Sequence, residues 1–140
     1  MPIKFLIVFF GVLKLLIACD FQTISIEEQR QAASCEPNQL CHYDNQVKIW
    51  LAEPEVTPET PFQIFLSLPA GYTVKSAKLE GITMYMGFIP VLFEVRDGLL
   101  VAQTMVGICA ERNMTWRLVL EVNDQQGQSE LAFYYFDATY

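Results

Sequence analysis

The chain has 140 residues, with 9 Lys and Arg against 16 Asp and Glu, one histidine and a formal net charge of −7. A negative surface repels the phosphate backbone of nucleic acids, so nucleic acid is excluded as an expected partner. Any catalytic group that needs histidine would have to use His42, and no GxSxG sequence occurs, so we expect the protein not to be an enzyme.

Residues 1–18 have the layout of a secretory signal peptide. Lys4 precedes an apolar run over residues 5–13, and a second apolar run, 15–18, follows Lys14. Runs of this length are too short to span a bilayer. The alternatives are an uncleaved amphipathic anchor or cleavage elsewhere, because Lys14 interrupts the apolar stretch.

The signal peptide ends in Leu16-Ile17-Ala18-Cys19, which resembles a bacterial lipobox. The resemblance implies that the chain is cut before Cys19 and that this cysteine is acylated and anchors the protein to a membrane. Asp20 resembles the enterobacterial signal that retains lipoproteins in the inner membrane. We therefore expect a lipid-anchored protein on the periplasmic face of a bacterial membrane, with the inner membrane favoured.

Residues 19–34 are predicted to form a lipidated tether. The segment 20–34 is polar and lacks a sustained apolar period, although a short helix over residues 25–33 is an alternative. Cleavage before Cys19 removes two lysines, which leaves 7 basic against 16 acidic residues and a net charge of −9. The remaining 122 residues, 140 minus 18, suffice for one domain with a hydrophobic core and not for two.

Residues 35–140 are predicted to form one β-sandwich domain. Apolar and polar residues alternate in several short segments, and this period of two is typical of strands. The predicted strands are residues 46–52, 62–68, 76–86, 89–96, 99–106, 114–122 and 131–137. About seven strands without a long helical segment predict an antiparallel immunoglobulin-like (cupredoxin-like) sandwich, with a small open barrel as the alternative.

The segment 114–122 alternates most regularly. Its even-numbered side chains share one face of an extended strand, and we expect that face to lie in the core. The residues of this face are Met114, Trp116, Leu118, Leu120 and Val122. Met114 is predicted to stand at the edge of this inward row.

With Cys19 assigned to lipid, three cysteines remain in a compartment that favours disulfides. Cys35 and Cys41 enclose a short loop with proline and asparagine, so we expect a disulfide between them. Cys109 then has no partner in the chain, and either it packs as a small hydrophobic residue or it has a function. Cys41 and His42 could offer a sulfur and an imidazole to a metal ion, but adjacent residues of a strand point to opposite faces, so both could bind one ion only at a turn. We therefore expect His42 at the surface.

Four sulfur-bearing residues are predicted to gather at one rim of the sandwich, namely Met84, Met86, Cys109 and Met114. On an extended strand, residues two apart project from the same side about 7 Å apart. Thioether and thiolate sulfurs are soft ligands that favour copper(I), so these four residues are candidate metal ligands. Tyr85 and Trp116 are candidates for an exposed aromatic residue beside the site. The alternative is that the methionines only fill the core.

The segments MYMG, residues 84–87, and GICAERNMTW, residues 107–116, resemble a pattern found in small exported proteins of proteobacteria. That pattern is Met-x-Met-Gly followed by Cys-x4-Met-x-Trp. The resemblance implies a role in copper handling or with a respiratory oxidase, and a membrane protein as partner. The chain is more loosely similar to periplasmic copper(I) chaperones of cupredoxin-like fold, but it has no His-x-Met pair.

Three functions remain open from the sequence. The first is a membrane-anchored periplasmic lipoprotein that binds copper(I) or delivers it to a membrane respiratory complex. The second is a non-metal structural or assembly lipoprotein that docks a membrane-protein partner through an exposed face of the aromatic strand at residues 133–136. The third is a thiol redox function of Cys35 and Cys41, although their C-x5-C spacing lacks the closeness of catalytic thiols. Copper carriage is the favoured hypothesis.

Overall fold

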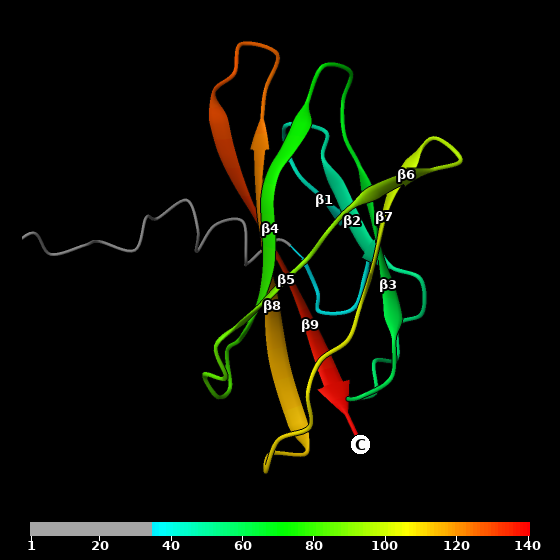
Figure 1. Ribbon diagram of the computed structural model, residues 1–140, viewed down its shortest axis with the longest axis vertical. Helices are drawn as coiled ribbons and strands as arrows, with labels where there is room; N and C mark the ends of the chain where they lie inside the picture. Colours follow the sequence, from blue (N-terminus) through cyan, green and yellow to red (C-terminus); the bar gives the residue numbers. More distant parts are fainter. Residues whose placement is uncertain (1–34) are drawn as a thin grey trace, which may run out of the picture.

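The computed structural model describes residues 35–140, which form two antiparallel sheets that face one another (Figure 1). The predicted signal peptide, the lipidated Cys19 and the tether up to residue 34 lie outside the described residues. Within residues 35–140, no helix is long and apolar enough to cross a membrane.

Nine strands make up the two sheets in this part of the chain. They are β1 (Cys41–His42), β2 (Lys48–Leu51), β3 (Phe62–Ser67), β4 (Thr73–Gly81), β5 (Phe88–Pro90), β6 (Glu94–Arg96), β7 (Leu99–Thr104), β8 (Asn113–Asn123) and β9 (Ser129–Thr139). One sheet has the order β1-β2-β3-β7-β6 and the other has the order β5-β4-β8-β9.

The order of the strands is that of an immunoglobulin domain. In such domains strands A, B, E and D form one sheet and strands C, F and G form the other. Here β2, β3, β7 and β6 correspond to strands A, B, E and D, and β4, β8 and β9 correspond to strands C, F and G. β1 and β5 are added edge strands, one in each sheet. The predicted immunoglobulin-like antiparallel sandwich is therefore confirmed, with nine strands in place of about seven.

The segment 89–96, predicted as one strand, is divided between the two sheets, so that prediction is wrong. β5 pairs with β4 and ends at Pro90, which has no N–H to donate to a ladder. The buried Val91 then donates its backbone N–H to the Ala77 carbonyl at 2.9 Å, and the chain crosses to pair β6 with β7. Residues 89–93 form one uninterrupted apolar run that continues past the end of β5, so the sequence gave no sign of the crossing.

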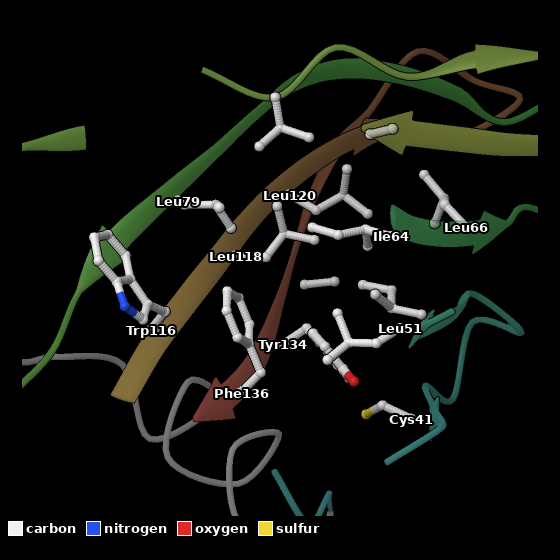
Figure 2. Close-up of a cluster of buried hydrophobic side chains, with 14 of the residues drawn as sticks. Cys41, Leu51, Ile64, Leu66, Leu79, Trp116, Leu118, Leu120, Tyr134 and Phe136 are labelled. Atoms are coloured by element: carbon white, nitrogen blue, oxygen red, sulfur yellow. The ribbon is translucent and has the colours of Figure 1, made fainter. Parts of the chain in front are cut away.

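The core lies between the sheets and is centred on β8, which pairs with both β4 and β9. The predicted inward row of β8 is confirmed, because all five of its even-numbered side chains from residue 114 to residue 122 are buried. Figure 2 shows Leu118 and Leu120 of β8 facing Ile64 and Leu66 of β3 on the other sheet. Packing across the two sheets therefore fixes which face of each strand points inward.

The outer edge of β9 is covered by the segment that leads into β1. Asn38 adopts a positive φ of 62°, which asparagine tolerates well. Its side-chain amide donates to the Asp137 carbonyl at 3.0 Å, and its side-chain oxygen accepts from the Asp137 N–H at 2.6 Å. One side chain thus satisfies both backbone groups of Asp137 that face away from β8, which leaves less of this edge open to another chain.

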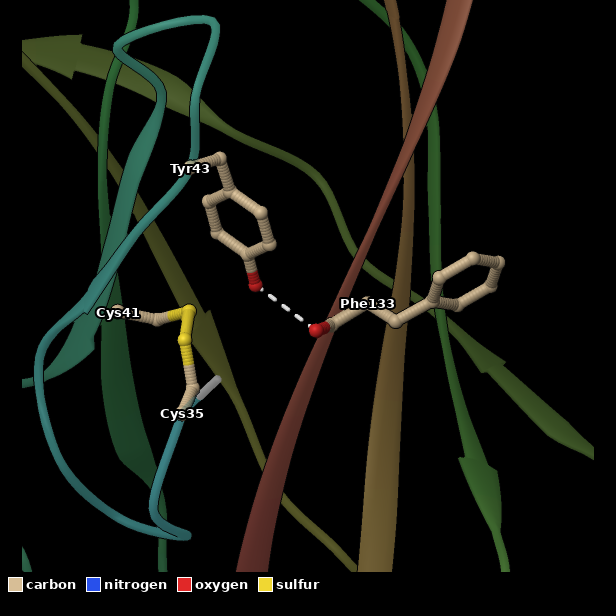
Figure 3. The surroundings of a disulfide bond; sticks show 4 residues. All are labelled: Cys35, Cys41, Tyr43 and Phe133. Atoms are coloured by element: carbon tan, nitrogen blue, oxygen red, sulfur yellow. Dashed lines mark hydrogen bonds between the residues drawn. A yellow bond between two sulfur atoms is a disulfide. The ribbon is translucent and has the colours of Figure 1, made fainter. Parts of the chain in front are cut away.

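A disulfide and a buried tyrosine hold the same segment in place (Figure 3). The predicted Cys35–Cys41 disulfide is confirmed, with the two Cα atoms 5.4 Å apart. Tyr43 is buried, and its hydroxyl donates to the Phe133 carbonyl on β9 at 2.8 Å. Burial, together with Tyr134 and Tyr135, raises the pKa of Tyr43, so the hydroxyl keeps the proton that it donates.

We predict that Tyr43→Phe lowers the free energy of unfolding by about 1 kcal/mol, because the buried Phe133 carbonyl loses its donor. Urea unfolding followed by circular dichroism measures the change. Tyr135→Phe is the matched control, since Tyr135 is a half-buried neighbour on β9, and it is expected to change stability by less than about 0.5 kcal/mol. Equal losses in the two variants would contradict this role for the Tyr43 hydroxyl.

A second prediction concerns Glu80, whose carboxylate is 2.7 Å from the Lys78 ammonium and 2.9 Å from the Arg117 guanidinium. Hydrogen bonds from Lys78 and then Arg117 lower the pKa of Glu80 below its ordinary value of 4.5. The ionised form is thus favoured in the folded state, and this stabilisation is complete above pH 4.5 and is lost as the pH falls through the lower folded pKa.

We therefore expect Glu80→Gln to lower the free energy of unfolding by about 1 kcal/mol near neutral pH and by much less near pH 3. Urea unfolding of the variant and the wild type at both pH values tests this. Glu94→Gln removes an exposed pair with Arg96 and serves as the control with little effect. A difference between Glu80→Gln and wild type that persists unchanged at low pH would argue against the ionic origin.

Candidate functional site

The loop of residues 82–87 connects β4 to β5 and carries Met84 and Met86. The sequence predicted a strand over 76–86, and this is wrong at its end, because β4 stops at Gly81. There the N–H groups of Ile82 and Thr83 both donate to the Thr115 carbonyl, at 2.8 and 3.4 Å. The Thr115 N–H donates to the Thr83 hydroxyl at 2.9 Å, so a side chain takes the place of the next ladder partner and the backbone turns away.

Gly81 is needed for this turn. A Cβ atom at this position would collide with the backbone carbonyl oxygen of Met84, which folds back over it. Gly87, at the other end of the loop, has a φ of 78°, a conformation that side chains disfavour. The two glycines therefore set the path of the loop between them.

The loop of residues 105–112 connects β7 to β8 and carries Cys109. Its backbone is held on two sides. The Glu59 N–H donates to the Val106 carbonyl at 2.8 Å, and the Tyr140 hydroxyl donates to the Cys109 carbonyl at 2.7 Å. Figure 1 shows both loops at the end of the sandwich where the chain terminates.

The two loops bring Met84 and Cys109 into contact. The Cys109 thiol lies 3.3 Å from the Met84 thioether sulfur and is oriented to donate to it. Cys109 is half-buried, while Met84 and Met86 are exposed at 41% and 43%. The methyl group of Met86 approaches the same loop at Gly107, 3.9 Å from where a Cβ atom on this glycine would stand. The sulfur atoms of Met84 and Cys109, which belong to two distant segments, thus meet at an accessible surface, and the Met86 side chain reaches the same loop.

Met114 is placed differently. It is 1% exposed and belongs to the core row of β8, and its methyl group packs beneath Gly81. The structure therefore brings it under the loop of Met84 without placing it at the surface. Trp116 is also buried, so the prediction that it stands exposed beside the site is wrong, whereas Tyr85 is 78% exposed. The indole points inward because the side chain of Trp116 lies on the same face of β8 as the other even-numbered residues, which form the core row.

His42 and the remaining cysteines lie elsewhere on the chain. His42 is exposed on β1 while its neighbour Cys41 is fully buried and bonded to Cys35, as the sequence predicted. Among residues 35–140, no group of three or more His, Cys, Asp or Glu side chains is arranged to hold a metal ion.

The exposed aromatic face predicted for residues 133–136 is reduced to Tyr135, which is half-buried. Tyr134 and Phe136 point into the core, and Phe133 on the outer face is also buried. The guanidinium of Arg117 on β8 covers the Phe133 ring, with its central carbon 5.3 Å from the ring centroid. Strand parity predicts which rings face outward, but it cannot show that a long side chain of the adjacent strand covers one of them.

Two residues that position the sulfur atoms escaped the sequence analysis. Thr83 fixes the turn after β4 through the Thr115 N–H, and Tyr140 fixes the loop of Cys109 through its carbonyl. Both act through hydrogen bonds between residues far apart in the chain, and these depend on strand register. No local pattern in the sequence signals them.

A thiol and thioethers on converging loops form a soft donor set. After loss of its proton the thiol is a strong ligand for copper(I), and thioethers bind this ion in preference to hard cations such as magnesium or calcium. In the second loop, the carbonyl groups of Val106 and Cys109 already accept hydrogen bonds. The arrangement is therefore suited to holding a soft ion rather than to acid–base chemistry.

The fold and the loops together define an immunoglobulin-like β-sandwich with paired sulfur residues at one end. Neither a comparison with models of protein families nor a search of curated proteins finds a match for this chain.

We predict that Met114→Ala lowers the free energy of unfolding by about 3 kcal/mol, because it leaves a cavity in the core. Met86→Ala removes the same side chain from an exposed loop and is expected to cost less than about 1 kcal/mol. Urea unfolding of the two variants gives the comparison. Similar losses of unfolding free energy in the two variants would contradict the assignment of Met114 to the core and Met86 to the surface.

Proposed function

We propose that this protein is a membrane-anchored periplasmic lipoprotein that binds copper(I) through Met84, Met86 and Cys109 and delivers it to a membrane respiratory complex. The ion is cargo, held for transfer. Met114 supports the loop of Met84 from below rather than contributing a ligand.

The observation that carries the proposal is the 3.3 Å contact between the Cys109 and Met84 sulfurs, made by residues 25 positions apart. Cys109 packs partly against the core, but it is only half-buried and its sulfur meets an exposed methionine. A second methionine, Met86, reaches the same loop. Three soft donors at one accessible place suit an ion that must be both taken up and released.

Binding is expected to depend on pH through the thiol. When copper(I) binds Cys109, the S–H bond breaks, an S–Cu bond forms and the proton passes to water. Thioethers carry no proton, so Met84 and Met86 add affinity without adding pH dependence.

The anchoring part of the proposal rests on the sequence before the described residues. The lipobox-like Leu16-Ile17-Ala18-Cys19 supports acylation of Cys19, and the polar residues 20–34 support a tether. The resemblance of residues 84–87 and 107–116 to exported proteins with copper or oxidase roles supports a membrane metalloenzyme as the recipient.

Titration of the reduced full-length protein with copper(I), against a coloured copper(I) chelator, tests the function. We expect one ion per chain, with affinity weakened at least about tenfold in Met84→Leu and Met86→Leu and more in Cys109→Ser. Cys109→Ser should also lose the pH dependence. Met105→Leu is the matched control, because Met105 is an exposed methionine of the same loop as Cys109.

Absence of stoichiometric binding, or binding undiminished in both Met86→Leu and Cys109→Ser, would remove the copper function. The alternative would then be a structural or assembly lipoprotein. That role predicts that the same membrane partner is recovered from detergent extracts when all three sulfur residues are replaced by residues of similar shape.

A further inference from the structure

The loops of residues 82–87 and 105–112 expose a concentrated set of apolar side chains. They hold half of the large hydrophobic residues that are exposed in the described part of the chain. These residues are Ile82, Met84, Tyr85, Met86, Met105 and Ile108. Contiguous exposed apolar groups on a monomer indicate contact with a partner or a membrane.

Most of the two loops carries no charge. No charged residue occurs from Gly81 to Phe93 or from Leu99 to Ala110, in a chain whose net charge is −7. The exposed Glu59 lies beside the second loop, where its N–H donates to the Val106 carbonyl. The first charges after the second run, Glu111 and Arg112, are exposed at the end of its loop. The apolar side chains suit the hydrocarbon region of a bilayer, and the exposed tyrosine suits its interface. The charges that flank the loop suit the headgroup region.

The shape of this end also favours lipid over a folded partner. Figure 1 shows the backbone of the two loops projecting beyond the strands at this end of the sandwich. Tyr85, the most exposed of their side chains, lies within the projecting β4–β5 loop. Lipid chains adapt to projecting side chains, whereas a protein partner would need a matching hollow.

The chain ahead of the described residues is long enough to allow this contact. Fully extended, the fifteen residues from Asp20 to Ser34 reach about 50 Å. The longest strands of the sandwich, with 11 residues, extend about 36 Å. A domain tethered at Cys19 can therefore turn either end to the membrane. We expect the end with the apolar loops to face the membrane, because burial of these side chains in lipid is favourable.

We propose that the loops of residues 82–87 and 105–112 insert into the interface of the bilayer to which Cys19 is anchored. The inference rests on the proposed lipid anchor and not on copper binding. The contact is made by apolar burial, so neutral lipid is sufficient, and the acidic protein gains nothing from anionic lipid.

Tryptophan quenching by brominated lipid tests the proposal. Full-length lipidated protein carrying Tyr85→Trp is reconstituted into phosphatidylcholine vesicles with or without bromine on the acyl chains. We expect roughly twofold quenching of the added emission in the brominated vesicles, because the indole reaches the interface. Leu131→Trp, at an exposed position near the start of β9, should match the wild type, in which Trp116 is buried and Trp50 half-buried.

A second variant, Ile108→Asp in the Tyr85→Trp background, places a charge in the neighbouring loop at an exposed position that the fold tolerates. It should reduce the quenching to the level of the Leu131→Trp control. Circular dichroism confirms that the variant remains folded.

The outcomes separate the anchor from the insertion. Vesicle flotation without quenching of Tyr85→Trp leaves the lipid anchor intact and overturns the insertion. Failure to float overturns both the anchor and the insertion built on it. Protection of the added tryptophan in native membranes but not in lipid vesicles identifies a protein as the occupant and also overturns the proposal.

Discussion

Burial of one face of β8 between the sheets is the constraint on which the rest of the structure depends. β8 pairs with β4 on one side and β9 on the other, and its inward side chains meet β3 across the core. Burial of each such side chain contributes roughly 2 kcal/mol, and a slip of one residue would turn the whole row toward solvent. Register is therefore fixed strongly. It sets Gly81 opposite Trp116, and with it the point at which β4 ends and the loop of Met84 begins.

The sulfur residues depend on this register although none of their contacts lies within a sheet. Thr115 of β8 anchors the loop after β4 by both of its backbone groups. The last residue of the chain, Tyr140, follows β9 and holds the loop of Cys109. Core packing thus determines the relative positions of Met84 and Cys109. The placement of the two surface loops therefore follows from the alternation of apolar and polar residues along the strands.

The sequence was most informative where a pattern was local and one face of a strand was buried. Alternation identified β8 with its inward face, and the spacing of Cys35 and Cys41 identified their disulfide. Prediction from the sequence failed where tertiary contacts override the local pattern. The strand expected up to Met86 ends at Gly81 because Thr83 competes for the ladder, and residues 89–96 divide between sheets. For the candidate site, turn positions brought Met84 and Cys109 to one rim, although the methionines lie in a loop rather than on the expected strand. Strand parity correctly predicted that Trp116 points into the core, which conflicts with its role as an exposed residue beside the site.

The Cys35–Cys41 disulfide has a mechanical consequence for a domain held by its leading segment. Tension on the chain ahead of Cys35 passes through the sulfur–sulfur bond to the fully buried Cys41. The intervening residues, including Asn38, are thereby relieved of the load, and their hydrogen bonds to β9 are not peeled away in sequence. Reduction of the disulfide would transfer this force to the hydrogen bonds at the edge of the sheet. The resistance of the domain to pulling therefore depends on the redox state of Cys35 and Cys41.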